Sequence, residues 1–183
     1  GGGSLYVNPI NNPTPANGTV FEIVSKVSAG VATSTFLGLP EGRSVYMGAR
    51  NGKISYVGGD GNDVTLTVAP TLDIDGDSRY LPETDGLLIT RYIRGLTGPA
   101  LATQVVATSA GARRTVNADV EAYLAHLGNA LDVDQNGVIN STDSTLILRY
   151  MFGFRGAALI AGVPLPGGEN ANTVAARIAA LTP

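Results

Sequence analysis

The chain has 183 residues, a formal net charge of -3 at pH 7, no cysteine and a single histidine. The lack of cysteine excludes disulfides and thiol catalysis. Arginine and lysine form no basic stripe, and the isolated pair Arg113 and Arg114 is expected to be solvated, so we expect no nucleic acid partner. The apolar runs are far shorter than the roughly 18 residues that a membrane span needs, so we expect no membrane insertion.

Residues 1–70 have the pattern of a small β-rich module, either a sandwich or the cap of a solenoid. Short runs of β-branched and aromatic residues alternate with Asn, Gly and Pro turns. The candidate strands are 5–10, 19–27, 32–39, 44–49, 53–57 and 63–70. The clearest pair is a hairpin around the turn GGDGND, with Ile54 and Tyr56 before it and Val64, Leu66 and Val68 after it.

The hairpin turn allows another interpretation. GGDGNDVTL matches one calcium nonapeptide of the RTX type, which needs tandem copies to coordinate ions between the turns of a β-roll. The longer segment FLGLPEGRSVYMGARNGKISYVGGDGNDVTLTV resembles the closing part of secreted bacterial β-solenoid or autotransporter-like proteins. This resemblance implies that the chain forms the C-terminal end of a longer protein.

The stretch LDVDQNGVINSTD contains a pattern for wrapping a calcium ion. The first, third, fifth and twelfth places of a loop are Asp132, Asp134, Asn136 and Asp143. Calcium takes roughly six to eight oxygen ligands, so alternating residues must turn oxygens inward. Val138 would supply its backbone carbonyl and Asn140 a direct or water-mediated contact, while Gly137 allows the sharp turn. Apolar residues at helical spacing follow Asp143 and predict an amphipathic helix.

A second copy of this pattern precedes the first. Its candidate ligands are Asp73, Asp75, Asp77, Arg79 and Asp85. Adding 58 takes Asp85 to Asp143 and continues without gaps toward the C-terminus, which indicates an internal repeat. The offset from Asp73 to Asp132 is 59 residues rather than 58, so the earlier loop is one residue longer than the later one. Its sixth place is Ser78, where a left-handed conformation would cost about 1 kcal/mol relative to glycine, unless the turn moves to Gly76.

Each repeat is expected to contain a calcium loop, a helix, an irregular Ala/Gly/Pro linker and a second helix. The second helix of the first repeat is NADVEAYLAHLG, capped by Asn117 and ended by Gly128. Its counterpart is TVAARIAAL at the C-terminus. The expected fold class is therefore α+β in two modules, with the β-rich module followed by an all-α domain at 71–183. The repeats of that domain span about 72–128 and 131–183.

The signatures DxDxNGxxNxxD and LILRYMFG resemble the dockerin family, whose modules pair two calcium loop–helix units. The resemblance covers roughly residues 72–183, with a repeat longer than is typical of the family. It implies two bound calcium ions. It also implies that the tenth and eleventh places of the later loop, Ser141 and Thr142, contact a cohesin-like partner.

The sequence favours a binding module over an enzyme. His126 has no sequence-local nucleophile or metal partner, and the clustered carboxylates belong to the calcium loops. We expect a noncatalytic calcium-binding C-terminal module of a larger secreted or surface bacterial protein, which docks another protein or caps its own parent chain. Extracellular calcium suits loops of modest affinity, which favours an extracellular or cell-surface location. The alternative is an accessory fragment of an adhesin or carbohydrate-active enzyme whose active region lies upstream.

Overall fold

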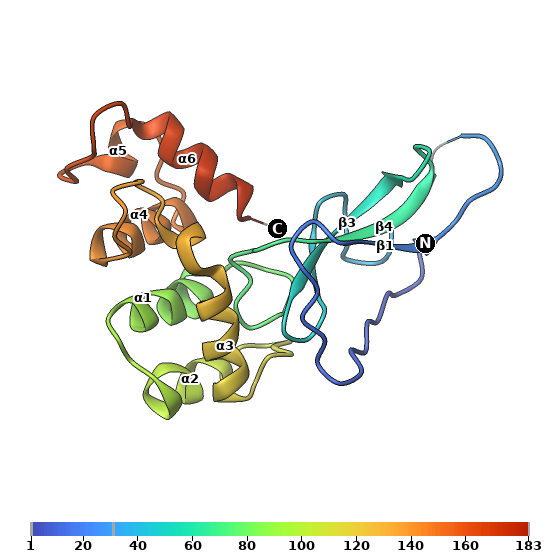
Figure 1. Ribbon diagram of the computed structural model, residues 1–183, viewed down its shortest axis with the longest axis horizontal. Helices are drawn as coiled ribbons and strands as arrows, with labels where there is room; N and C mark the ends of the chain where they lie inside the picture. The colour runs from blue at the N-terminus through green and yellow to red at the C-terminus, as the bar shows by residue number, and fades with distance from the viewer. Residues whose placement is uncertain (1, 31, 183) are drawn as a thin grey trace.

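The computed structural model describes residues 2–30 and 32–182. A small sheet lies at one end of the molecule and the helices at the other (Figure 1). The strands are β1 (Val20–Val24), β2 (Ser44–Tyr46), β3 (Asn51–Gly58) and β4 (Asp63–Val68). They form one antiparallel sheet in the order β1-β4-β3-β2.

The predicted hairpin is present as β3 and β4. Ile54 pairs with Leu66, and both side chains are buried, while the register shifts between Ser55 and Gly58. The apolar face of the sheet packs against irregular segments rather than against a second sheet. The buried Tyr56 hydroxyl, for example, donates a 2.6 Å hydrogen bond to the carbonyl oxygen of Leu39. Loops thus cover the core of this part of the chain.

Two of the six candidate strands are wrong. Residues 5–10 and 32–39 contain no strand among the described positions, apart from an isolated bridge between Phe36 and Leu39. Asn11 and Asn12 have positive φ angles of 58° and 46°, which breaks an extended course directly after the earlier segment. A sandwich needs two sheets and a solenoid needs stacked turns, whereas the described residues form a single four-stranded sheet. Both expectations for the β-rich part are therefore corrected.

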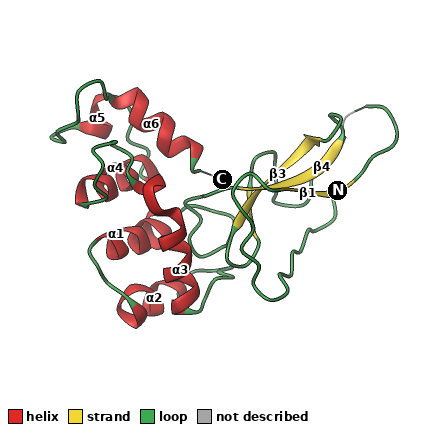
Figure 2. Cartoon of the chain, viewed as in Figure 1, coloured by secondary structure: helices red, strands yellow, loops and turns green. Residues whose placement is uncertain are grey.

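The helical part follows the sheet in the chain, and its helices lie apart from the strands (Figure 2). Its elements are η1 (Pro82–Gly86), α1 (Leu87–Ile93), α2 (Gly98–Val106), α3 (Asn117–Leu127), η2 (Gly128–Leu131), α4 (Ser141–Met151), α5 (Ala157–Ile160) and α6 (Ala171–Ala180). The repeat is visible in the core, because Leu88 and Ile89 of α1 and their counterparts Leu146 and Ile147 of α4 are all fully buried. No helix within 2–30 and 32–182 combines the length and apolar character needed to cross a membrane.

The linkers between the predicted helices are not irregular, because α2 and the short α5 lie within them. Helix α2 begins after Thr97 and buries Leu101 and Val105, which are four residues apart and face the same core. The predicted cap at Asn117 is also wrong. Val116 is the N-cap residue of α3, and the Asn117 side chain instead bonds to the hydroxyl of Thr103 at 3.0 Å.

The predicted fold class, an all-α dockerin-like domain after a β-rich sandwich or solenoid cap, is corrected to a mixed fold of one four-stranded antiparallel sheet and six α-helices within the described residues. The Lys53 ammonium in β3 donates hydrogen bonds of 2.9 and 2.7 Å to the carbonyls of Ala180 and Thr182 at the C-terminal end of α6. The Tyr123 hydroxyl in α3 donates to the carbonyl of Thr71, just beyond β4. Sheet and helices therefore form one mixed fold, and the loop that follows Thr71 lies where they meet.

Candidate metal-binding loops

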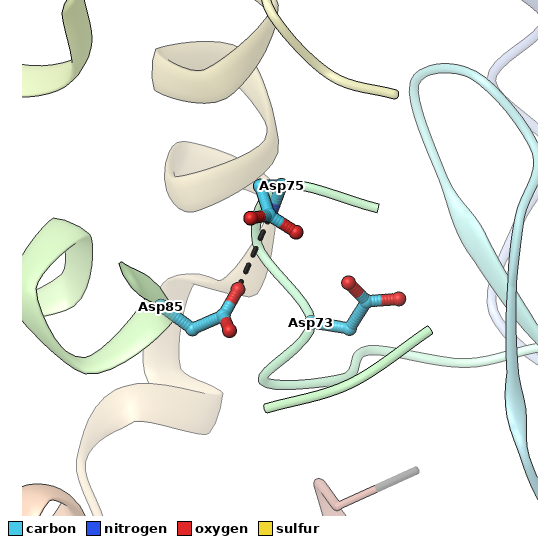
Figure 3. Close-up of side chains that lie close together, drawn as sticks. All are labelled: Asp73, Asp75 and Asp85. Carbon is cyan, nitrogen blue, oxygen red and sulfur yellow. Dashed lines mark hydrogen bonds between the residues drawn. The ribbon is translucent and has the colours of Figure 1, made fainter. Parts of the chain in front are cut away.

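Two groups of three aspartates could each hold a metal ion. They are Asp73, Asp75 and Asp85 in the first loop (Figure 3), and Asp132, Asp134 and Asp143 in the second. In each group, one carboxylate oxygen from every residue lies within 4.8 Å of the other two. The first group is fully buried, whereas Asp132 of the second group is half-buried. Three ionised carboxylates this close repel one another strongly unless a cation lies among them or a proton neutralises one of them.

Asp85 closes the first loop by binding its backbone. Its Oδ1 accepts a 2.6 Å hydrogen bond from the amide of Ile74, and its Oδ2 accepts one of 2.8 Å from Leu81. The hydroxyl of Thr84 also donates to Oδ2 at 3.1 Å. Asp85 lies in the π-helical turn that leads into α1, so the helix start and both ends of the loop meet at one carboxylate.

Asp143 does the same in the second loop. Its Oδ1 accepts from the amide of Val133 and its Oδ2 from the amide of Asn140, both at 2.9 Å. Asn140 in turn caps α4, because its Oδ1 accepts a 2.7 Å bond from the amide of Thr142. Ser141, the first residue of α4, is exposed, and Thr142 is half-buried. The predicted contact residues thus lie on the first turn of α4, directly beside the loop.

The two loops share the same pair of left-handed positions, although they place glycine differently. The fourth and sixth places have φ angles of 79° and 69° at Gly76 and Ser78, and of 57° and 82° at Gln135 and Gly137. The turn therefore does not move from Ser78 to Gly76, because both positions are left-handed in both loops. Each loop has one glycine and one strained residue.

The remaining predicted ligands of the second loop lie on its exposed rim. Asn136 donates to the carboxylate of Asp134 at 3.0 Å and accepts from the amide of Val138 at 2.8 Å. The carbonyl of Val138 accepts a 3.0 Å bond from the Asn140 side chain. These oxygens are part of the loop, but the three-aspartate group does not include them.

Asp77 and Arg79 have the corresponding place in the first loop. Asp77 is half-buried and lies outside the three-aspartate group. Its amide donates to Asp75 at 3.1 Å, and its own Oδ1 accepts a 2.7 Å bond from the amide of Arg79. The side chain of Arg79 is exposed and lines a cleft beside the loop.

Residues of the sheet support the first loop, which sequence reasoning missed. The Ser44 hydroxyl in β2 donates a 2.9 Å hydrogen bond to Oδ2 of Asp73. The Asn51 side chain in β3 donates to the backbone carbonyl of Asp73 at 2.7 Å. Both are fully buried polar residues, which need hydrogen-bond partners. No local pattern in the sequence identifies them, because their burial and their contact with Asp73 arise only in the folded chain.

Arg114 was expected to be solvated, but it is 1 % exposed and lies beneath the first loop. Its guanidinium donates to the carbonyl of Ile74, to that of Gly48 at 2.9 Å and to Oδ1 of Asn51 at 3.0 Å. It also lies 3.9 Å from the ring centroid of Tyr123, within reach of a cation–π contact. Arg114 thus brings one positive charge close to the loop, while its hydrogen bonds go to other acceptors.

Burial makes the loop carboxylates costly to ionise. Desolvation raises the pKa of Asp73 to about 7, against the opposing effects of the Ser44 hydrogen bond and the Arg114 charge. It raises the pKa of Asp85 well above its usual range, and the charges of Asp75 and Asp73 add to the effect. Either a proton or a bound cation removes this cost.

Both loops could hold a cation. Each offers oxygen ligands alone, supplied by a short loop and by the start of the following helix. Oxygen-only sets suit hard cations, whereas zinc and copper sites in proteins favour nitrogen and sulfur ligands. Comparison of the chain with family models, with curated proteins and with solved structures found no match.

Proposed function

We propose that the chain is a noncatalytic calcium-binding module, in which two ions order the loops and fix the helices that follow. The observation that carries the proposal is the duplication of one arrangement: three convergent aspartates, a pair of left-handed turn residues, and a helix start at the last of the three aspartates, which is the thirteenth residue of the first loop and the twelfth of the second. Acidic turns that only face solvent would not be expected to repeat all three of these features in the same chain. The same duplication carries the resemblance to dockerin loop–helix units.

Calcium fits these loops better than magnesium. Magnesium demands near-ideal octahedral geometry and gives up its water reluctantly, whereas calcium accepts roughly six to eight oxygens in flexible arrangements. Beyond the three carboxylates, further oxygens are available at the rim, from Asp77 in the first loop and from Asn136 and the Val138 carbonyl in the second. Small side-chain rotations at the rim would complete a calcium shell.

Binding of calcium is expected to act as folding energy. A ligand that binds only the folded state stabilises it by about 2.7 kcal/mol when its concentration is one hundred times the dissociation constant. Loops of modest affinity reach that regime in extracellular calcium and not in a bacterial cytoplasm. We therefore propose a secreted or cell-surface setting for the parent protein.

Calorimetric titration of the chelator-stripped protein with calcium and with magnesium tests the proposal. We expect two calcium ions per chain in the wild type and one in each of Asp85→Asn and Asp143→Asn. Asp60→Asn is the matched control, because it removes the same charge from an exposed turn outside both groups. A wild-type protein that takes up no calcium would end this proposal.

A second candidate role is docking of a cohesin-like partner at the later loop. The exposed position of Ser141 on the first turn of α4, next to Thr142, favours it. Capture from the secreted proteins of the source, compared between wild type and Ser141→Asp with Thr142→Asp, tests this role. A partner lost in the double variant while calcium binding persists supports docking. Capture that is unchanged removes these residues from the interface, and a cap or spacer in an adhesin or carbohydrate-active protein then becomes the better proposal.

A further inference from the structure

A cleft of about 530 Å³ lies between the N-terminal segment, the sheet and the first loop. Its walls combine two kinds of side chain. Three are arginines and four are aliphatic, namely Arg43, Arg79, Arg113, Leu5, Leu37, Leu39 and Val45. The cleft adjoins the first loop, but neither the proposed calcium binding nor the proposed docking at Ser141 and Thr142 uses it. Three basic residues in one place also stand out in a chain whose net charge is -3.

The arginines of the cleft retain hydrogen-bond donors. Arg43 donates one 3.2 Å bond to the carbonyl of Ser78, and Arg113 one of 2.6 Å to that of Val7. The Arg79 side chain makes no hydrogen bond within the described residues, where the one ion pair joins Arg177 to Glu169. A guanidinium has five N–H donors, so most of the donors of these three groups remain available to a ligand.

Charge in the cleft is one-sided. Asp77 is the carboxylate of its lining, and it already accepts a hydrogen bond from the amide of Arg79. Three guanidinium groups thus face one carboxylate. Since guanidinium groups bind carboxylates through paired, charge-assisted hydrogen bonds, the cleft has the chemistry to hold carboxylates of a ligand.

Arg113 is held in place by aromatic rings. Its guanidinium carbon lies 4.4 Å from the ring centroid of Tyr6 and 4.6 Å from that of Tyr46. This arrangement fixes the charge and covers a face of each ring. A sugar would stack on such ring faces, so the geometry disfavours a carbohydrate. Aliphatic walls beside fixed charges instead suit a chain that carries both carboxylates and apolar side chains.

We propose that this cleft binds an acidic peptide segment of a partner protein. Its carboxylates would pair with Arg43, Arg79 and Arg113, and its aliphatic side chains would pack on Leu5 and Leu37. The proposal does not require filled metal loops, because the three arginine side chains lie outside both aspartate groups. Failure of this proposal would therefore leave calcium binding untouched, and the reverse also holds.

Fluorescence anisotropy with a labelled, end-capped peptide of alternating leucine and glutamate tests the proposal on the whole chain in calcium-containing buffer. We expect saturable binding that weakens at least about tenfold in Arg43→Gln with Arg79→Gln, because each change removes charge-assisted hydrogen bonds. The same peptide with glutamine in place of glutamate should bind equally weakly. Arg79→Gln keeps the backbone carbonyl of the loop, so the metal site is not altered directly.

Arg94→Gln is the matched control, since it removes one arginine at the exposed end of α1, outside the cleft. It should leave peptide affinity unchanged. Thermal melts of all variants establish that they are folded. Equal binding of the glutamine peptide, unchanged affinity in the double variant, or stronger binding of an oligogalacturonate than of the acidic peptide would each overturn the proposal.

Discussion

The side chain of Asn51 in β3 donates a 2.7 Å hydrogen bond to the backbone carbonyl of Asp73, the first residue of the first loop. The same amide group donates to the hydroxyl of Thr71 at 2.8 Å, and its oxygen accepts from Arg114 at 3.0 Å. Asn51 is fully buried and uses both ends of its side chain. One residue of the sheet therefore holds both the first loop and the buried guanidinium of Arg114 in place.

Asn51→Ala is expected to lower the free energy of unfolding by about 2 to 4 kcal/mol. The change leaves the guanidinium of Arg114 and the carbonyl of Asp73 with fewer partners in a buried place, and each unsatisfied buried group costs about 1 to 3 kcal/mol. Urea unfolding at fixed calcium measures the loss. Asn129→Ala, at an exposed site, should change stability by about 0.5 kcal/mol or less. Equal losses in the two variants would contradict the proposed role of Asn51.

Metal-free protein should be more stable at pH 5.5 than at pH 8. The pKa of Asp73 is about 7 in the folded chain and the pKa of Asp85 is raised well above its usual range, so between the unfolded and folded pKa values the folded state binds more protons. The free energy of unfolding therefore falls as pH rises through this range, and each of these carboxyl groups contributes on the order of 1 kcal/mol per pH unit.

Calcium should reverse this pH dependence, since protons and calcium compete for the same carboxylates. The rise in melting temperature on adding calcium is expected to be larger at pH 8 than at pH 5.5. Differential scanning calorimetry measures the melting temperature under all four conditions, with chelator and with calcium at each pH value. A calcium effect that is the same at both pH values would show that the buried aspartates are not its ligands.

Gly76→Ala should destabilise the protein more than Gly137→Ala. Both glycines have φ near 80°, so each substitution introduces left-handed strain of about 1 kcal/mol. A Cβ on Gly76 would also lie 2.6 Å from the ring of Tyr46, whereas one on Gly137 would meet no atom within 4 Å. The Tyr46 ring is held against Arg113 and cannot move freely. Overpacking adds about 1 to 3 kcal/mol, which thermal melts of the two variants would separate.

Ser78→Gly is expected to stabilise the protein by up to about 1 kcal/mol. Ser78 has a φ of 69°, and its hydroxyl makes no hydrogen bond within the described residues, so glycine relieves strain without loss of a contact. Gln135→Gly should gain less, because the Gln135 side chain donates a 2.8 Å bond to the carbonyl of Asp132. Chemical denaturation of both variants tests the order. A larger gain at Gln135 would contradict this account.

Local patterns made much of the site predictable. Aspartates at alternating places, a loop-closing aspartate and the helix after it all lie within a few turns of chain, so spacing indicated the three aspartates that converge in each loop. The same spacing also included Asp77, which lies outside the first group. The hairpin of β3 and β4 was predictable for the same reason. Helix α2 was missed because its flanking glycines suggested a linker, although Pro99 in its first turn and the alanines and Leu101 that follow favour a helix.

Long-range contacts set the rest. Ser44 and Asn51 reach Asp73 across 29 and 22 residues of sequence, and Arg114 reaches Asn51 across 63. No spacing rule connects positions so far apart, because their approach depends on how the sheet packs against the helices. The same packing makes the first loop more buried than the second. Which aspartates can converge is thus a property of the chain segment, whereas the burial and electrostatics of each aspartate are properties of the folded whole.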